Sequence, residues 1–121
     1  MNQYKMIIPG QVPAKANSYK IIYKGGHPSL GKTKAMEEYE QAFYWLCPHR
    51  GVDIKGMFKA EIDVYFLTIS SDLDNAAKCI LDCLQQCKVI HNDNKCVELH
   101  MRKFKDPKNP RAEITITEIE L

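Results

Sequence analysis

The stretch from Phe58 to Thr68 constrains the fold more than any other feature of this sequence. Apolar and polar or charged side chains alternate along it, so every second side chain suits a hydrophobic core and the others suit water. A chain of 121 residues can build one apolar core around such a strand, and it is too short for two domains. The sequence therefore predicts a single domain over residues 1–121 with this half-buried strand in its sheet.

A helical repeat follows this strand. Between Leu73 and Gln86 the apolar residues recur at intervals of three and four, which places them along one side of a helix. A second helix is expected to begin at Thr33 or Lys34 and to end before Pro48. The other expected strands are residues 1–8, 96–105 and 112–118, the last two joined as a hairpin. This order predicts an α+β domain in which two helices pack on one face of a mixed β-sheet.

The segment between residues 11 and 32 has no clear periodicity. It contains Pro13, Pro28 and three glycines, and a short strand is expected only at Tyr19–Tyr23. A loop of this length is uncommon in a compact domain, and long loops often carry function. We therefore expect a functional loop here.

The net charge of +2 hides an uneven distribution. The first 34 residues contain six lysines and no Asp or Glu, and residues 101–111 contain five basic residues against one acid. Such stretches can contact the phosphates of a nucleic acid, or they can be ordinary solvated surface. The candidates for contact with DNA are Lys15, Tyr19, Lys20, Tyr23, Lys32, Lys34, Arg102, Lys103 and Lys105.

A group of acidic residues surrounds the second predicted helix. Asp72 and Asp74 stand where the strand gives way to the helix, and Lys78 follows Asp74 by one helical turn. Asp93 comes after the helix, and we expect an adjacent strand to return it to the helix start. Three carboxylates around one pocket suit Mg²⁺ or Mn²⁺, and such an ion can activate water for attack on phosphorus. In the alternative interpretation, one carboxylate caps the helix and Asp74, Lys78 and Asp82 form an exposed ladder of ion pairs.

The cysteines offer a second metal hypothesis. Cys79, Cys83 and Cys87 recur every four residues along the predicted helix, whereas zinc ligands usually occur in pairs within short loops. We therefore favour buried small apolar residues over zinc ligands, with Cys79 pointing outward as the reactive thiol. Five cysteines without an export signal are typical of reduced thiols in the cytoplasm. No apolar run is long enough to span a membrane.

The acidic motif resembles that of the RusA family. The resemblance rests on the run Asp72-Leu73-Asp74-Asn75, on Lys78 and on Asp93, and it extends to the closing segment Ile-Thr-Ile-Thr-Glu. It also includes a first strand ended by proline and an Asn-Ser-Tyr in the long loop, so it covers essentially the whole chain. RusA-like proteins are homodimeric, Mg²⁺-dependent endonucleases, often carried by prophages, that resolve Holliday junctions in DNA recombination and repair.

The resemblance implies a RusA-like fold and assigns roles to the motif. Asp72, Asp74 and Asp93 would bind Mg²⁺, with Mn²⁺ as a substitute, and Lys78 would be the catalytic lysine. Asn92 stands where family members commonly carry a second acid. The implied substrate is a four-way junction or other branched DNA. Two other functions remain open at this point: a metal-dependent nuclease for other DNA branches, and a module that binds branched DNA without cutting it.

Overall fold

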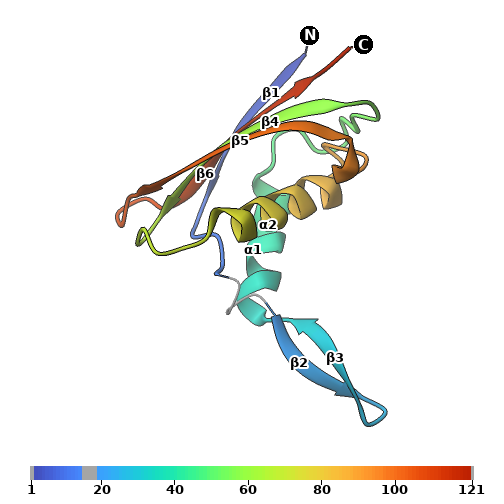
Figure 1. Cartoon of the computed structure of the whole chain (residues 1–121), viewed down its shortest axis with the longest axis vertical. Helices are drawn as coiled ribbons and strands as arrows, with labels where there is room; N and C mark the ends of the chain where they lie inside the picture. The colour runs from blue at the N-terminus through green and yellow to red at the C-terminus, as the bar shows by residue number, and fades with distance from the viewer. Residues whose placement is uncertain (1, 15–18, 121) are drawn as a thin grey trace.

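The computed structural model describes residues 2–14 and 19–120. Within them, two α-helices cover one face of a four-stranded mixed sheet, and a two-stranded arm projects from the body (Figure 1). The expected α+β class is confirmed. The sheet consists of β1 (Gln3–Pro9), β4 (Phe58–Phe66), β5 (Cys96–Lys105) and β6 (Arg111–Glu118), and the helices are α1 (Lys34–Leu46) and α2 (Leu73–Gln86).

The strands lie in the order β1-β6-β4-β5. β4 pairs antiparallel with β6 and parallel with β5, so the expected hairpin between the last two strands is wrong. The reason lies in β4, whose helix-facing side chains, such as Ile62 and Val64, are at most 1 % exposed and which is flanked by a strand on each edge. Because α2 forms the crossover from β4 to β5, those two strands must run parallel.

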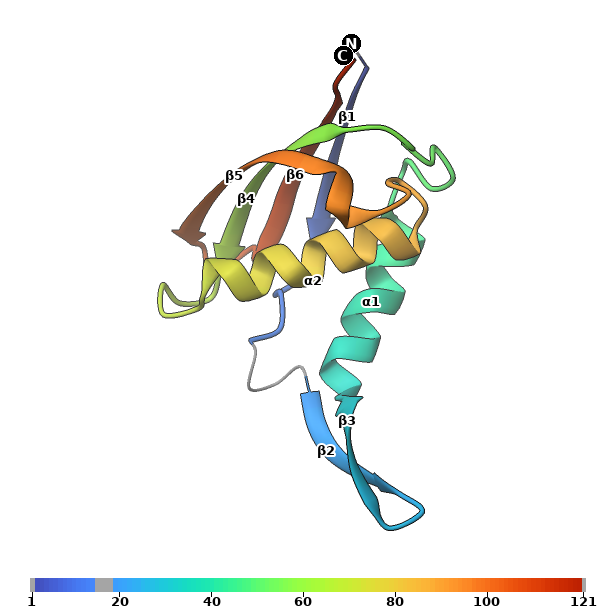
Figure 2. The same cartoon turned by 45° about the vertical axis from the view of Figure 1, so that its right-hand side comes forward.

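The core lies between the sheet and the two helices (Figure 2). α1 begins where the sequence predicts, because the Thr33 hydroxyl oxygen accepts a hydrogen bond of 3.2 Å from the Met36 backbone N–H. Tyr39 and Phe43 point from α1 into the core, and Ile80 and Leu84 come from the apolar side of α2. Neither α-helix of the described residues is long and apolar enough to cross a membrane.

The cysteines of α2 belong to this core. Cys79, Cys83 and Cys87 are all buried, which agrees with their interpretation as small apolar residues. The expectation that Cys79 points outward is wrong: it is 5 % exposed, and its Sγ atom lies 3.8 Å from the sulfur of Met36. The thiol with a lowered pKa is instead Cys47, where a hydrogen bond from Cys87 lowers the pKa to about 6.

Residues 19–32 form a hairpin rather than a loop, and the short strand expected at Tyr19–Tyr23 is confirmed as its first strand. β2 (Tyr19–Lys24) pairs antiparallel with β3 (His27–Lys32) and with no other strand of the described chain. Gly25 and Gly26 have φ values of 58° and 81°, the conformation of a two-residue turn that glycine allows. The second strand escaped detection because Pro28 and Gly31 interrupt its pattern. The hairpin, here called the arm, points away from the sheet beyond the start of α1 (Figures 1 and 2).

Candidate active site

Asp72 and Asp74 stand together at the start of α2. Asp72 occupies the N-cap position with an extended backbone, but its side chain makes no capping hydrogen bond, and Asp74 lies in the first turn. Both residues are exposed. In the alternative interpretation one carboxylate caps the helix, but no capping hydrogen bond from either side chain is present. Two adjacent carboxylates are thus available to an external ligand.

Two hydrogen bonds hold this helix start in place. The Asn75 side-chain amide donates to the Pro13 carbonyl oxygen at 3.0 Å, which explains the amide in the acidic motif. The Lys103 ammonium group donates to the Ser71 carbonyl oxygen at 3.0 Å. Lys103 was predicted as a contact for DNA, and its half-buried side chain places a positive charge on the backbone of the residue that precedes Asp72.

Lys78 lies on the exposed surface of α2. Its side chain is 70 % exposed, and its ammonium group is 3.8 Å from a carboxylate oxygen of Asp82. Of the two ion pairs predicted along this helix, Asp74–Lys78 and Lys78–Asp82, only the second is present among the ion pairs of the described residues. An exposed pair of this kind contributes at most about 1 kcal/mol, so Lys78 can exchange Asp82 for a phosphate at little cost.

Asp93 lies at the opposite end of α2. It opens a 3₁₀ turn, Asp93–Lys95, and its backbone N–H donates a hydrogen bond of 3.0 Å to the Gln85 side chain in the last helical turn. Asp74 lies in the first turn of α2 and Gln85 in the last, so at a rise of 1.5 Å per residue about 16 Å of helix separates Asp74 from the turn that carries Asp93. The side chain of Asn92 accepts a hydrogen bond from the Asn94 backbone N–H at 3.0 Å and so caps this turn.

The expectation that an adjacent strand returns Asp93 to the helix start is therefore wrong within one chain. β4 ends beside the start of α2, and β5 is parallel to β4, so β5 must begin at the other end of the sheet (Figure 2). In residues 2–14 and 19–120, no three side chains of His, Cys, Asp or Glu are grouped so that they could hold a metal ion. Within one chain, the predicted metal ligands Asp72 and Asp74 therefore lie together, and the third predicted ligand, Asp93, lies apart from them.

A comparison with known families identifies the group to which this arrangement belongs. The family model described as Endodeoxyribonuclease RusA matches residues 9–117, which is most of the chain. The chain belongs to the RusA family. It is accordingly an endodeoxyribonuclease that hydrolyses phosphodiester bonds, and members of this family resolve Holliday junctions and generally depend on a divalent metal. No curated protein matches the chain by sequence.

In this RusA-family chain, the lysines near the arm that were predicted to contact DNA differ in their exposure and in their ion pairs. Lys34 is 88 % exposed, and its ammonium group lies 3.8 Å from Glu38. Lys32 is 42 % exposed and contacts both carboxylate oxygens of Glu40, at 2.8 and 3.0 Å. Lys20 lies exposed on β2, and Lys15 lies outside the described residues.

The predicted DNA contacts on β5 are partly engaged within the chain. The Arg102 guanidinium donates two hydrogen bonds to Asp63, at 2.9 and 2.8 Å, so its charge is already neutralised. Lys105 is exposed at the end of the strand. Sequence patterns showed the basic residues but not these partners, because Asp63 lies far from Arg102 along the chain.

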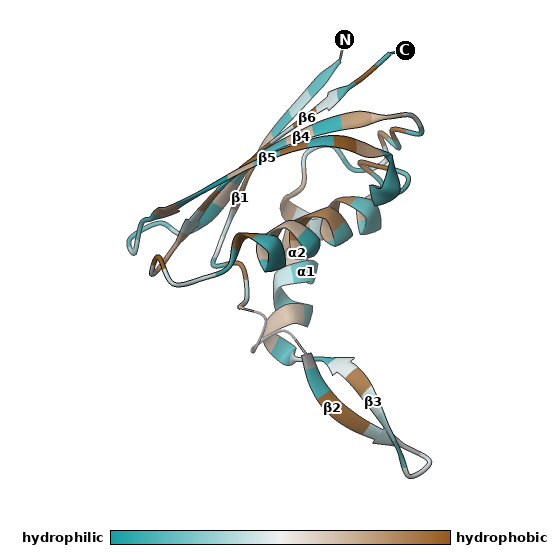
Figure 3. Cartoon of the chain, in the orientation of Figure 1, coloured by the Kyte–Doolittle hydropathy of each residue, from teal (hydrophilic) through white to brown (hydrophobic). Residues whose placement is uncertain are grey.

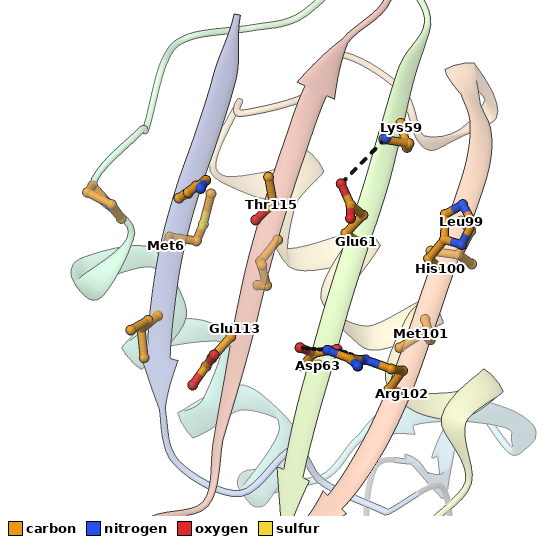
Figure 4. Close-up of a pocket in the computed structure, with 14 residues that line it drawn as sticks. Met6, Lys59, Glu61, Asp63, Leu99, His100, Met101, Arg102, Glu113 and Thr115 are labelled. Atoms are coloured by element: carbon orange, nitrogen blue, oxygen red, sulfur yellow. Dashed lines mark hydrogen bonds and ion pairs between the residues drawn. The ribbon is translucent and has the colours of Figure 1, made fainter.

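The open face of the sheet forms a broad hollow of about 1240 Å³ (Figure 4), and no residue of the acidic motif lines it. Its charged lining is mixed in sign: Lys5, Lys59, Glu61, Asp63, Arg102 and Glu113. Because three positive and three negative groups balance there, the hollow has no electrostatic preference for DNA. Because the family cuts DNA, Asp72 and Asp74 at the start of α2, whose carboxylates do not cap the helix, are a better candidate for the active site.

Proposed function

We propose that this chain is a Mg²⁺-dependent Holliday junction resolvase that acts as a homodimer. In this proposal each active site combines Asp72 and Asp74 of one copy with Asp93 of a second copy. The observation that carries it is the separation of the acids: Asp72 and Asp74 lie at one end of α2, and Asp93 is bound to Gln85 at the other.

A two-fold axis beside α2 would bring the separated acids together. Two copies of α2 that lie side by side and antiparallel place the start of each helix at the end of the other. One isologous contact would therefore build two identical sites. This is the symmetry that two opposed cuts in a four-way junction require.

The neighbouring edge strand supports this contact. β5 pairs only with β4 among the described strands, so its other edge has free backbone groups. Val97 and Leu99 on this strand are 53 % and 44 % exposed. Antiparallel pairing of the β5 edges of two copies would cover Val97 and Leu99. It would also place the start of one β5, next to Asp93, near the end of the other, where Lys103 contacts Ser71.

The donors at the start of α2 fit Mg²⁺. This ion prefers oxygen ligands and is usually held by one or two carboxylates together with water and substrate phosphate, and Asp72 and Asp74 offer carboxylates that no capping bond occupies. When bound, Mg²⁺ supplies an activated water and neutralises charge on the phosphate; Mn²⁺ supplies the same chemistry.

The side chains around these acids orient the substrate. The N-terminus of α2 attracts a phosphate through its free N–H groups. Lys78 contacts the scissile phosphate and stabilises the charge that develops during in-line attack. Lys103 offsets the negative charge of the two carboxylates. We place this reaction in recombination and repair of DNA in the cytoplasm.

Mixing two inactive variants tests the proposal. Asp74→Asn and Asp93→Asn chains should each fail to cut a four-way junction in Mg²⁺ while still binding it in Ca²⁺. After the two chains are mixed and allowed to exchange, the mixed dimer contains one intact site and should nick one strand. A site built within one chain predicts no nicking, because every site would keep one lesion.

The matched control mixes Asp72→Asn with Asp74→Asn. Both changes lie on the same side of the shared site, so no mixed dimer is intact and no nicking should return. Wild-type chain is assayed in parallel on a four-way junction, a three-way branch and a linear duplex. Cleavage of none of these substrates in Mg²⁺ or Mn²⁺ would overturn the enzymatic proposal in favour of a binding module.

A further inference from the structure

The arm has two chemically different faces. In its register Ile21 pairs with Leu30 and Tyr23 pairs with Pro28, and paired side chains share one face of a sheet. Ile21, Tyr23 and Leu30 are 68 %, 73 % and 70 % exposed. One face of the arm is therefore apolar and open to solvent, and both strands contribute hydrophobic residues to the arm (Figure 3).

The opposite face is polar and basic. It carries Lys20, His27 and Ser29, and residues 1–36 contain no acid at all. Ile22 is the exception on this face, and it lies over Gly31, whose added Cβ would come within 3.0 Å of it. Ile22 therefore packs on the arm itself, whereas Ile21, Tyr23 and Leu30 on the apolar face stay open to solvent.

The arm is firmly connected to the body at its root. Lys32, the last residue of β3, binds both carboxylate oxygens of Glu40 on α1 at 2.8 and 3.0 Å. Thr33 follows at once and caps α1 through its contact with the Met36 backbone N–H. The direction in which the arm points is therefore set by α1.

We propose that the arm is a wedge that inserts Ile21, Leu30, Tyr23 and Pro28 between unstacked bases at the branch point of DNA. This inference rests on the proposed function and names an element that selects branched over linear substrates. Proteins that unstack base steps use Leu, Ile and Pro as wedges, and aromatic rings stack on unpaired bases. An isolated hairpin is only marginally stable, and insertion would cover its exposed face.

Charge and length favour DNA over a second copy of the chain as the occupant. An arm with lysines and no acid is attracted to phosphates. Its six-residue strands extend about 20 Å, which exceeds the depth of either groove of B-DNA, about 8 Å. Lys20 on the basic face would then meet the backbone while the apolar face reaches the bases.

The test uses a four-way junction with the fluorescent base 2-aminopurine at the branch point, in EDTA so that no cutting occurs. Fluorescence of this base rises when it is unstacked. Wild-type chain should raise it, and the double variant Ile21→Ser/Leu30→Ser should lose most of the rise. The variant should bind the junction about tenfold more weakly, the loss expected when base stacking is removed, and bind linear duplex almost unchanged.

Ile7→Ser is the matched control, because Ile7 is also a strand isoleucine and is 61 % exposed, but it lies on β1, away from the arm. It should leave both signals intact. An unchanged fluorescence rise in the double variant would overturn the wedge. Light scattering tests whether a second copy of the chain covers the apolar face instead of DNA. If the double variant becomes monomeric, the apolar face belongs to a contact between copies, and the inference is overturned.

The wedge and the resolvase proposal fail separately. A chain that unstacks the branch-point base but never cuts in Mg²⁺ keeps the wedge and loses the resolvase assignment. A chain that cuts junctions without any rise in 2-aminopurine fluorescence loses the wedge alone.

Discussion

The Gln85 side-chain oxygen accepts a hydrogen bond of 3.0 Å from the backbone N–H of Asp93. This contact joins the last turn of α2 to the 3₁₀ turn that presents the Asp93 carboxylate. Asp74 begins the same helix, so α2 acts as a rigid spacer that fixes how far apart the two carboxylates lie. In the proposed dimer, the distance between them determines how the second copy must approach.

Gln85→Ala should therefore weaken catalysis without weakening binding. Loss of the side chain frees the turn that holds Asp93, and a small misplacement of a catalytic group can lower the rate by about 10- to 100-fold. The measurement compares the cleavage rate at saturating enzyme with junction affinity in Ca²⁺. Gln86→Ala is the control, because Gln86 binds Glu40 at 2.8 Å and not Asp93. Equal rates in both variants would contradict the positioning role.

Mg²⁺ should raise the melting temperature of the proposed dimer. An ion that binds only the assembled site stabilises it by about 2.7 kcal/mol at a hundredfold excess over its dissociation constant. Asp74→Asn and Asp93→Asn should each abolish the increase, although the two residues lie far apart in one chain. Melts with and without millimolar Mg²⁺ provide the measurement. An increase that survives in Asp93→Asn would show that Asp93 is not a ligand.

Local patterns predicted most of the fold. The alternation after Phe58 and the apolar spacing from Leu73 to Gln86 each reflect burial of one face, which is a property of neighbouring residues in sequence. The Thr33 hydroxyl marked the start of α1 for the same local reason. The run Asp72-Leu73-Asp74-Asn75 was equally readable, because its residues are neighbours in the sequence.

Relations between distant segments escaped this reasoning. No local signal shows that β4 separates β5 from β6, so the direction of β5 and with it the position of Asp93 were wrong. The second strand of the arm was overlooked because Pro28 and Gly31 disrupt its pattern. The arm is held instead by a glycine turn and the contact between Lys32 and Glu40. Likewise, Asp63 could not be identified as the partner of Arg102.

Removing one hydroxyl from the core should stabilise the chain. The Tyr39 hydroxyl is buried and has no hydrogen-bond partner in the described part of the chain, and burial raises its pKa. An unpaired buried hydroxyl costs about 1–3 kcal/mol. Tyr39→Phe should therefore match or exceed the wild type in free energy of unfolding, measured in urea. Tyr44→Phe, at an exposed position of the same helix, should change nothing. Clear destabilisation by Tyr39→Phe would show that the hydroxyl has a partner.

Acid should remove the contribution that the ion pair between Arg111 and Asp106 makes to the stability of the fold. Its guanidinium contacts Asp106 at 2.9 Å and holds the pKa of that carboxyl below the usual 3.8. Between the lowered and the usual pKa, the unfolded chain binds more protons than the folded chain, so this stabilisation is complete above about pH 4 and fades as the pH falls. Thermal melts should show Arg111→Gln below wild type near pH 7, with a smaller gap near pH 2.

The control for this series is Lys108→Gln, an exposed change in the same turn, which should leave the whole profile unchanged. The Arg111 guanidinium also lies 3.7 Å from the centre of the Tyr65 ring. Stacking on a neutral ring does not depend on pH in this range, so a constant gap between variant and wild type would assign the effect to the ring.

Lys34 and Lys32 should differ in their effect on the salt dependence of junction binding. Each phosphate contact adds about one unit to the slope of log affinity against log salt concentration. Lys34 is 88 % exposed, so Lys34→Ala should lower the slope by about one unit. Lys32 is already neutralised by Glu40 at 2.8 Å, so Lys32→Ala should lower it by less. Binding titrations in EDTA over a range of salt measure both slopes, with the exposed Lys55→Ala as control. An unchanged slope in Lys34→Ala would place the phosphate contacts away from the root of the arm.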